Sequence, residues 1–161
     1  MYLNGICSTE NCVNQDEIEA IVNAAVATLY EQDAQAIQFD VAERMLSARL
    51  AALLSPAFPD HSVHAEYNRH GVEPKGIEMP DAQGKPTLKF VYPDIIVHRP
   101  GTDDDNLLVI EMKKSTNGMK DEQDLEKLDR IKYQLGYSHA LFLRLSTGEG
   151  ASVENAYHIW R

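Results

Sequence analysis

The strongest constraint on how this chain folds is a nearly continuous apolar run, LLVIEMK, from Leu107 to Lys113. Such a run, without strict alternation, is typical of a strand that is buried on both faces of a sheet. A second apolar and β-branched stretch, Leu88 to His98, precedes it, and the polar turn Arg99 to Asn106 joins the two. The pattern therefore predicts a hairpin at the centre of a sheet. Pro93 is expected to mark an edge or a bulge in the first strand, because proline has no amide hydrogen for a ladder.

Helices and further strands are expected on both sides of this hairpin. Apolar residues at helical spacing predict helices over about residues 15–32, 41–54 and 120–135. Asn14 with Glu17 has the form of a capping box for the first helix, and Gly136 is placed to end the last one. Strands are expected over residues 62–69, 140–145 and 155–160, and the segment 71–86, rich in glycine and proline, is expected to be a loop.

The order of these elements predicts an α/β fold with a mixed sheet flanked by helices. It combines an antiparallel hairpin with a strand–helix–strand crossover, and the two connections together require strands of both directions. The 161 residues are expected to form one domain, 1–161, with an N-terminal arm over residues 1–13.

The charge of the chain restricts the ways in which it can bind other molecules. The formal net charge is −10, which weighs against holding nucleic acid by bulk electrostatics, because phosphate neutralisation needs Lys and Arg. It leaves room for an enzyme whose acidic groups are partly neutralised by metal ions. No apolar run of about 18 residues is present, and the N-terminus lacks the pattern of a secretory signal. We therefore expect no membrane partner and a cytoplasmic location.

Two acidic residues of the central hairpin are candidates for a metal site. If the two strands pair, Asp94 and Glu111 converge at the end of the hairpin opposite its turn. Two carboxylates at a strand edge suit Mg²⁺, with Mn²⁺ as a substitute, since Mg²⁺ keeps several water and phosphate oxygens as ligands. The backbone carbonyl of Met112 would add a ligand. Glu43, on the leucine stripe of the second helix, either caps that helix in a box with Asp40 or joins the metal shell from the sheet margin.

Lys113 lies on the same face of its strand as Glu111, because side chains two residues apart share a face. Beside two acids it would stay protonated in the absence of a metal. It would then either orient or deprotonate an attacking water, or stabilise negative charge on a transition state resembling a phosphorane. Metal, water and cation are the parts that phosphodiester hydrolysis requires.

Pro93-Asp94 followed by Glu111-Met112-Lys113 at the end of an apolar strand resembles the motif of the PD-(D/E)XK nuclease superfamily. The resemblance implies a restriction-endonuclease-like core, α-β-β-β-α-β, over residues 40–145, with an extra N-terminal helix and a C-terminal strand. It implies Asp94 and Glu111 as metal ligands, Lys113 as the catalytic lysine and Glu43 as an auxiliary acid.

By this resemblance the chain is expected to cut nucleic acid, DNA in preference to RNA, as a homodimer or within a larger complex. Two alternatives stay open. One is a non-catalytic binding or assembly module on the same fold. The other is an α/β domain in which Glu111 and Lys113 form only an ion pair at the end of a strand.

Overall fold

The computed structural model describes residues 13–70 and 73–161. The predicted arm over residues 1–13 therefore lies, but for its last residue, outside the described residues. The helices of the described part are α1 (Gln15–Gln32), α2 (Ala34–Gln38), α3 (Glu43–Leu54) and α4 (Glu122–Leu135), with the short 3₁₀ helices η1 (Ser55–Ala57) and η2 (Val153–Asn155). The strands are β1 (Ser62–Ala65), β2 (Arg69–His70), β3 (Glu73–Pro74), β4 (Gly76–Pro80), β5 (Pro86–Phe90), β6 (Ile95–His98), β7 (Leu108–Lys114), β8 (His139–Leu145) and β9 (Tyr157–Trp160).

A five-stranded sheet in the order β1-β6-β7-β8-β9 forms the centre of the molecule. β7 and β8 are parallel, and the other neighbouring pairs are antiparallel, so the predicted mixed sheet is confirmed. The predicted central hairpin is confirmed as β6 and β7, and α4 forms the crossover between β7 and β8. Within the sheet and its main flanking helices the chain runs α1, α3, β1, β6, β7, α4, β8, β9, and the part from α3 to β8 has the order α-β-β-β-α-β.

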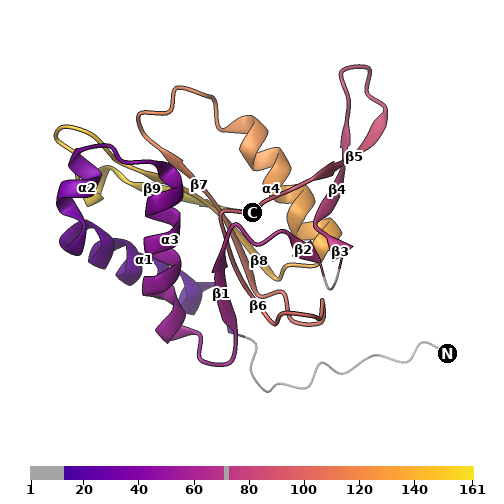
Figure 1. The fold of residues 1–161 in the computed structure, drawn as a ribbon, viewed down its shortest axis with the longest axis horizontal. Helices are drawn as coiled ribbons and strands as arrows, with labels where there is room; N and C mark the ends of the chain where they lie inside the picture. The colour runs from indigo at the N-terminus through magenta and orange to yellow at the C-terminus, as the bar shows by residue number, and fades with distance from the viewer. Residues whose placement is uncertain (1–12, 71–72) are drawn as a thin grey trace.

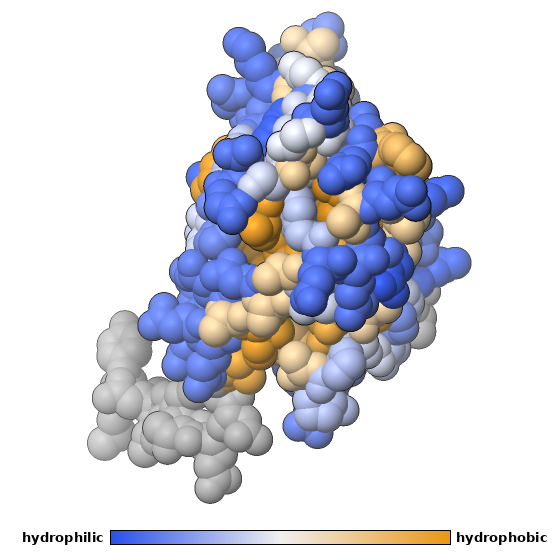
Figure 2. Space-filling model, turned by 90° about the vertical axis from the view of Figure 1, so that its left-hand side faces the viewer, coloured by the Kyte–Doolittle hydropathy of each residue, from blue (hydrophilic) through white to orange (hydrophobic). Residues whose placement is uncertain are grey.

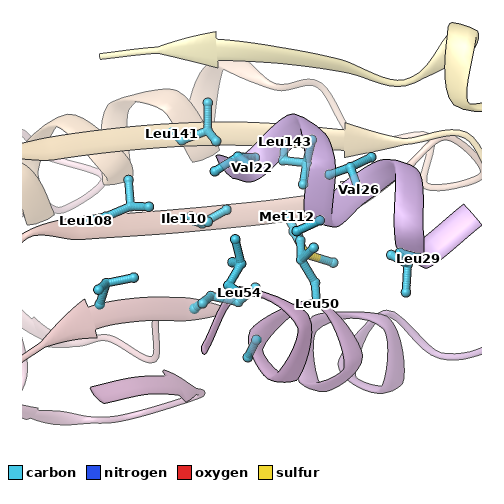
Figure 3. Packing of buried hydrophobic residues seen from close by; sticks show 14 of the residues in the cluster. Val22, Val26, Leu29, Leu50, Leu54, Leu108, Ile110, Met112, Leu141 and Leu143 are labelled. Atoms are coloured by element: carbon cyan, nitrogen blue, oxygen red, sulfur yellow. The ribbon is translucent and has the colours of Figure 1, made fainter. Parts of the chain in front are cut away.

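Helices cover both faces of the sheet, with α1 and α3 on one side and α4 on the other (Figure 1). The larger core lies between the sheet and the pair α1–α3. Figure 3 shows side chains of the two helices meeting those of the central strands: Val22 and Val26 of α1, Leu50 and Leu54 of α3, Leu108, Ile110 and Met112 of β7, and Leu141 and Leu143 of β8. A second core, built around Leu128 and Ile131, lies under α4.

The segment predicted as a loop is the clearest difference between expectation and structure. From residue 76 onward it forms the hairpin β4–β5, whose register runs from Gly76 opposite Phe90 to Pro80 opposite Pro86. The expected single strand from Leu88 to His98 is accordingly divided into β5 and β6, which belong to different sheets. The break falls around Pro93, as predicted. Packing of the buried Ile77 beneath α4 stabilises the hairpin, a contribution that glycine and proline content does not reveal.

The ends of several elements also differ from expectation. The capping box of Asn14 and Glu17 and the left-handed Gly136 (φ 72°) at the end of α4 are confirmed. The proposed capping box of Asp40 and Glu43 is wrong: Ala42 precedes α3, and no side chain caps that helix. Asp40 has φ 54°, and its carboxylate instead contacts Lys114 Nζ at 3.0 Å. The short helix α2, with the single buried residue Ile37, has too few apolar positions to show periodicity.

The outer surface of the helical layer is mixed in character. Figure 2 shows hydrophilic side chains around apolar ones on the side formed by α1 to α3. In the described part of the chain, no helix combines the length and the apolar character needed to span a membrane.

Candidate functional site

The candidate site lies on the α4 side of the sheet, where β6 begins and β7 ends. In the β6–β7 pair, Ile95 is opposite Ile110 and Ile96 is opposite Val109. Continuing this register by one pair places Asp94 opposite Glu111, and directly opposite residues of an antiparallel pair share a face. The two carboxylates that the sequence predicted to converge therefore lie near the same end of the β6–β7 pair, with Asp94 in the bend just before β6.

Glu111 is a buried acid in which one carboxylate oxygen accepts a hydrogen bond and the other has no partner among the described residues. It belongs to β7, a strand that is buried on both faces, and the residue is only 5% exposed. Oε2 accepts a hydrogen bond from Lys127 Nζ of α4 at 3.0 Å, whereas Oε1 has no hydrogen-bond partner among the described residues. Burial raises the pKa of Glu111 to about 8, the charge of Lys127 opposes this rise, and the charge of Asp94 adds to it.

Asp94 is held by the backbone of the neighbouring strand. Its Oδ2 accepts a hydrogen bond of 2.7 Å from the amide N–H of Met112. Burial raises the pKa of Asp94 to about 6; the Met112 hydrogen bond lowers it, and the negative charge of Glu43 raises it further. Met112 thus orients a predicted metal ligand through its N–H, while the role of its carbonyl as a ligand stays a prediction.

Lys113 lies on the same face as Asp94 and Glu111 but forms its salt bridge with a third acid, Asp124. It is almost fully buried, and its Nζ forms a salt bridge with Asp124 of α4 and approaches the carbonyl of Lys120 at 3.4 Å. The sequence analysis expected Asp94 and Glu111 as the acidic neighbours of Lys113 and did not predict its pairing with Asp124. The pairing arises because α4 lies across the end of β7 and presents a carboxylate there.

Glu43 approaches the same end of β7 from the opposite helical layer. It is the first residue of α3, and its Oε2 accepts a hydrogen bond of 3.0 Å from the amide N–H of Lys114. Of the two interpretations of Glu43, the structure therefore favours the one that directs it to the sheet margin. Whether it ligates a metal there stays a prediction.

Two residues of α4, Asp124 and Lys127, belong to the site although the sequence analysis did not select them. Each contacts a charged residue of β7 that bears the opposite sign: Asp124 pairs with Lys113, and Lys127 with Glu111. Lys127 Nζ lies 3.0 Å from Glu111 Oε2, so α4 supplies the cation beside this buried acid. The sequence did contain a signal for these two contacts. Asp124 and Lys127 are an acid and a base three residues apart on the helix that follows the E-x-K strand, and residues at that spacing lie on the same side of a helix.

The candidate site offers a divalent cation few protein ligands, so water and phosphate would have to complete its coordination shell. Within residues 13–70 and 73–161, no three or more His, Cys, Asp or Glu side chains are grouped so that they could hold a metal ion. The unpartnered Glu111 Oε1 and the remaining oxygen of Asp94 would be the two carboxylate ligands of such an ion, and Mg²⁺ binds through one or two carboxylates when water and phosphate complete its shell. The site thus fits Mg²⁺ bound together with a phosphate better than a preformed protein cage.

Comparison of the chain with models of protein families, with curated proteins and with solved structures found no match.

Proposed function

We propose that this chain is a metal-dependent nuclease with a restriction-endonuclease-like core, which hydrolyses phosphodiester bonds of nucleic acid, DNA in preference to RNA. The observation that carries the proposal is the buried Glu111 carboxylate, which has an unpartnered oxygen and lies across the strand pair from Asp94. The order α3, β1, β6, β7, α4, β8 supports it, because it is the α-β-β-β-α-β order that the PD-(D/E)XK resemblance implies.

A buried acid beside a half-buried one is unfavourable unless something compensates their charge. Lys127 compensates one oxygen of Glu111 and leaves the other unsatisfied. Asp94 and Glu111 would hold Mg²⁺, or Mn²⁺ in its place, with Glu43 and the Met112 carbonyl as further proposed ligands. A bound divalent ion supplies a polarised phosphoryl oxygen and a water of lowered pKa.

The residues of the chain itself would orient the reacting groups. The Met112 amide fixes the carboxylate of Asp94 through Oδ2, and the other oxygen would bind the ion. Asp124 holds the Lys113 ammonium on the face that carries both acids. A positive charge in that position would stabilise the negative charge that develops on the scissile phosphate, and α4 shields the interaction from water.

Cleavage of supercoiled plasmid and of single-stranded DNA and RNA, with Mg²⁺ or Mn²⁺, tests the proposal. We expect Asp94→Ala and Lys113→Ala each to reduce the cleavage rate by about 100-fold or more, the usual effect of removing a group that stabilises the transition state. Glu149→Ala, which removes an exposed acid, is the matched control and should cleave as the wild type does. Activity that survives both substitutions would remove the assigned site.

One observation favours the alternative of a non-catalytic module: the charged residues of β7 are already paired with α4, as in a structural cluster. Calorimetric titration with Mg²⁺ separates the two functions. A nuclease should bind the ion and gain about 2.7 kcal/mol of unfolding free energy at 100 times the dissociation constant, and Asp94→Ala should lose both effects. A module should show no binding in the wild type.

A further inference from the structure

The β4–β5 hairpin carries an exposed apolar surface close to the candidate site. It projects from the body of the domain (Figure 1), beside α4. Leu88 and Phe90 of β5 are 61% and 62% exposed, and Tyr92, which follows the strand, is 57% exposed. We name these three residues the hairpin platform. Their exposure has no role in the stability of the domain, since apolar side chains stabilise a fold by leaving water.

The register of the hairpin explains why Leu88 and Phe90 lie together. Ile77 of β4 faces α4 and is buried, so the alternate residues of both strands face outward. Phe90 is opposite Gly76, and a Cβ on that glycine would lie 2.9 Å from Leu88 Cδ1 and 3.7 Å from Phe90 Cδ1. Leu88 and Phe90 therefore lie over the bare backbone of Gly76, which a larger residue would prevent.

Contacts with α4 hold the platform in place. The amide of Gln134 accepts a hydrogen bond from the Glu78 N–H at 2.7 Å and donates one to the Glu78 carbonyl at 3.0 Å. Arg130 Nη1 donates to the same carbonyl at 3.1 Å. The hairpin is thus fastened to the helix that also carries Asp124 and Lys127.

The platform is continuous with the candidate site along the chain. Val91 and Pro93 are buried, so the exposed side chains at 88, 90 and 92 alternate with them and lead to the half-buried Asp94. A polymer lying on the platform would therefore run along the segment that ends at Asp94.

Charge decides which polymer fits. Residues 76–90 contain two acids, Glu78 and Asp81, and two lysines, Lys85 and Lys89, so their net charge is zero in a chain of −10. A duplex presents mainly its phosphates, and this region has no excess of cations to neutralise them. A single strand exposes its bases as well as its phosphates, and unpaired bases stack on aromatic side chains such as Phe90 and Tyr92, with Lys89 in the same segment available to a backbone phosphate.

We propose that the hairpin platform stacks the unpaired bases of a single-stranded nucleic acid and directs its backbone to Asp94 and Glu111. The inference rests on the proposed nuclease function and narrows its substrate to single strands or to unpaired segments within a duplex. Phe90 and Tyr92 act as binding residues, and Leu88 fills the space beside Phe90 over Gly76.

Fluorescence anisotropy with a labelled oligonucleotide, single-stranded or annealed to its complement, tests this in EDTA so that no cleavage occurs. We expect the wild type to bind the single strand more tightly, and Phe90→Ala and Tyr92→Ala each to weaken that binding about tenfold, the usual effect of losing one base stack. Phe39→Ala is the matched control: Phe39 is 73% exposed but follows α2 in the layer on the other side of the sheet. Equal affinities for the wild type and all variants would overturn the inference.

A second variant gives a direct signal of stacking. Phe90→Trp should keep single-strand affinity and show fluorescence quenching on binding that exceeds that of Trp160 in the wild type. Absence of this extra quenching, with affinity retained, would contradict stacking at Phe90. Sedimentation that shows self-association of the wild type, lost in Phe90→Ala with oligonucleotide binding unchanged, would assign the platform to a second copy of the chain instead.

The two proposals can fail separately. If the wild type binds single strands through Phe90 and Tyr92 but never cleaves with Mg²⁺ or Mn²⁺, the nuclease function fails and the platform stands. If the wild type cleaves and the platform variants cleave and bind equally well, the platform fails and the nuclease function stands.

Discussion

The two faces of β7 are buried alike but differ in chemistry. The buried part of the face toward α1 and α3 carries only apolar side chains: Leu108, Ile110 and Met112. The face toward α4 carries one apolar residue and then two charged ones: Val109, Glu111 and Lys113. All six are buried. A single strand thus contributes packing to one layer of the molecule and charged groups to the other.

The comparison shows how a small domain can keep buried charges. Glu111 and Lys113 each have an oppositely charged partner on α4, so neither is left alone in a medium of low dielectric constant. The apolar face supplies stability that does not depend on these pairs, because its contacts are with different helices. We expect substitutions on the two faces to have opposite effects on stability, and three predictions test this difference.

The largest effect is expected on the apolar face. Ile110→Ala should lower the free energy of unfolding by about 2–5 kcal/mol, because it leaves a cavity between β7 and the helices α1 and α3. Denaturant unfolding monitored by circular dichroism measures the change. Leu88→Ala, on the exposed hairpin, serves as the control and should change the value by about 0.5 kcal/mol or less. A small effect of Ile110→Ala would mean that this face can repack.

On the charged face, removal of a charge should stabilise the protein. The pKa of Glu111 is raised to about 8 in the folded chain from 4.5 when unfolded, so between these pH values the folded state binds more protons and stability falls as pH rises. In the absence of metal, Glu111→Gln should therefore be more stable than the wild type at pH 8, by an amount on the order of 2–4 kcal/mol, and nearly equal at pH 4.

Unfolding measured from pH 4 to 8 in EDTA tests this prediction. In Glu111→Gln the free energy of unfolding should still fall between pH 4 and 6, because the pKa of Asp94 is raised to about 6. Glu149→Gln, at an exposed position, should leave the profile unchanged. Parallel profiles of the wild type and Glu111→Gln would show that Glu111 does not resist ionisation.

The smallest effect concerns the ion pair that joins α4 to β7, between Lys127 and Glu111. Lys127→Ala removes the cation that opposes the rise in the Glu111 pKa. We expect the Glu111 pKa to rise further by about one unit, equivalent to about 1.4 kcal/mol, as followed by NMR of the labelled carboxyl carbon. Arg130→Ala on the same helix, whose guanidinium pairs with the exposed Glu126, is the control and should not move it. An unchanged pKa in Lys127→Ala would exclude the ion pair as a contributor.

Several features were determined by the sequence alone, because they depend on local geometry. Alternation along a strand is enough to put Glu111 and Lys113 on one face, and the antiparallel hairpin brings Asp94 opposite Glu111. The break at Pro93 follows from its missing amide hydrogen, and the end of α4 follows from the left-handed conformation that Gly136 accepts. These inferences need no knowledge of distant neighbours.

Only the tertiary structure decided which groups the charged residues contact. The position of α4 across the sheet depends on the packing of its whole apolar stripe, so periodicity could not assign Asp124 to Lys113 or Lys127 to Glu111. Glu43 had two competing partners, and the amide of Lys114, far away in the chain, prevailed over a local cap. The β4–β5 hairpin arose from the burial of Ile77 under α4, since residues 71–86 have no strand pattern of their own strong enough to predict it. Local rules thus placed the carboxylates together, whereas long-range packing chose their partners.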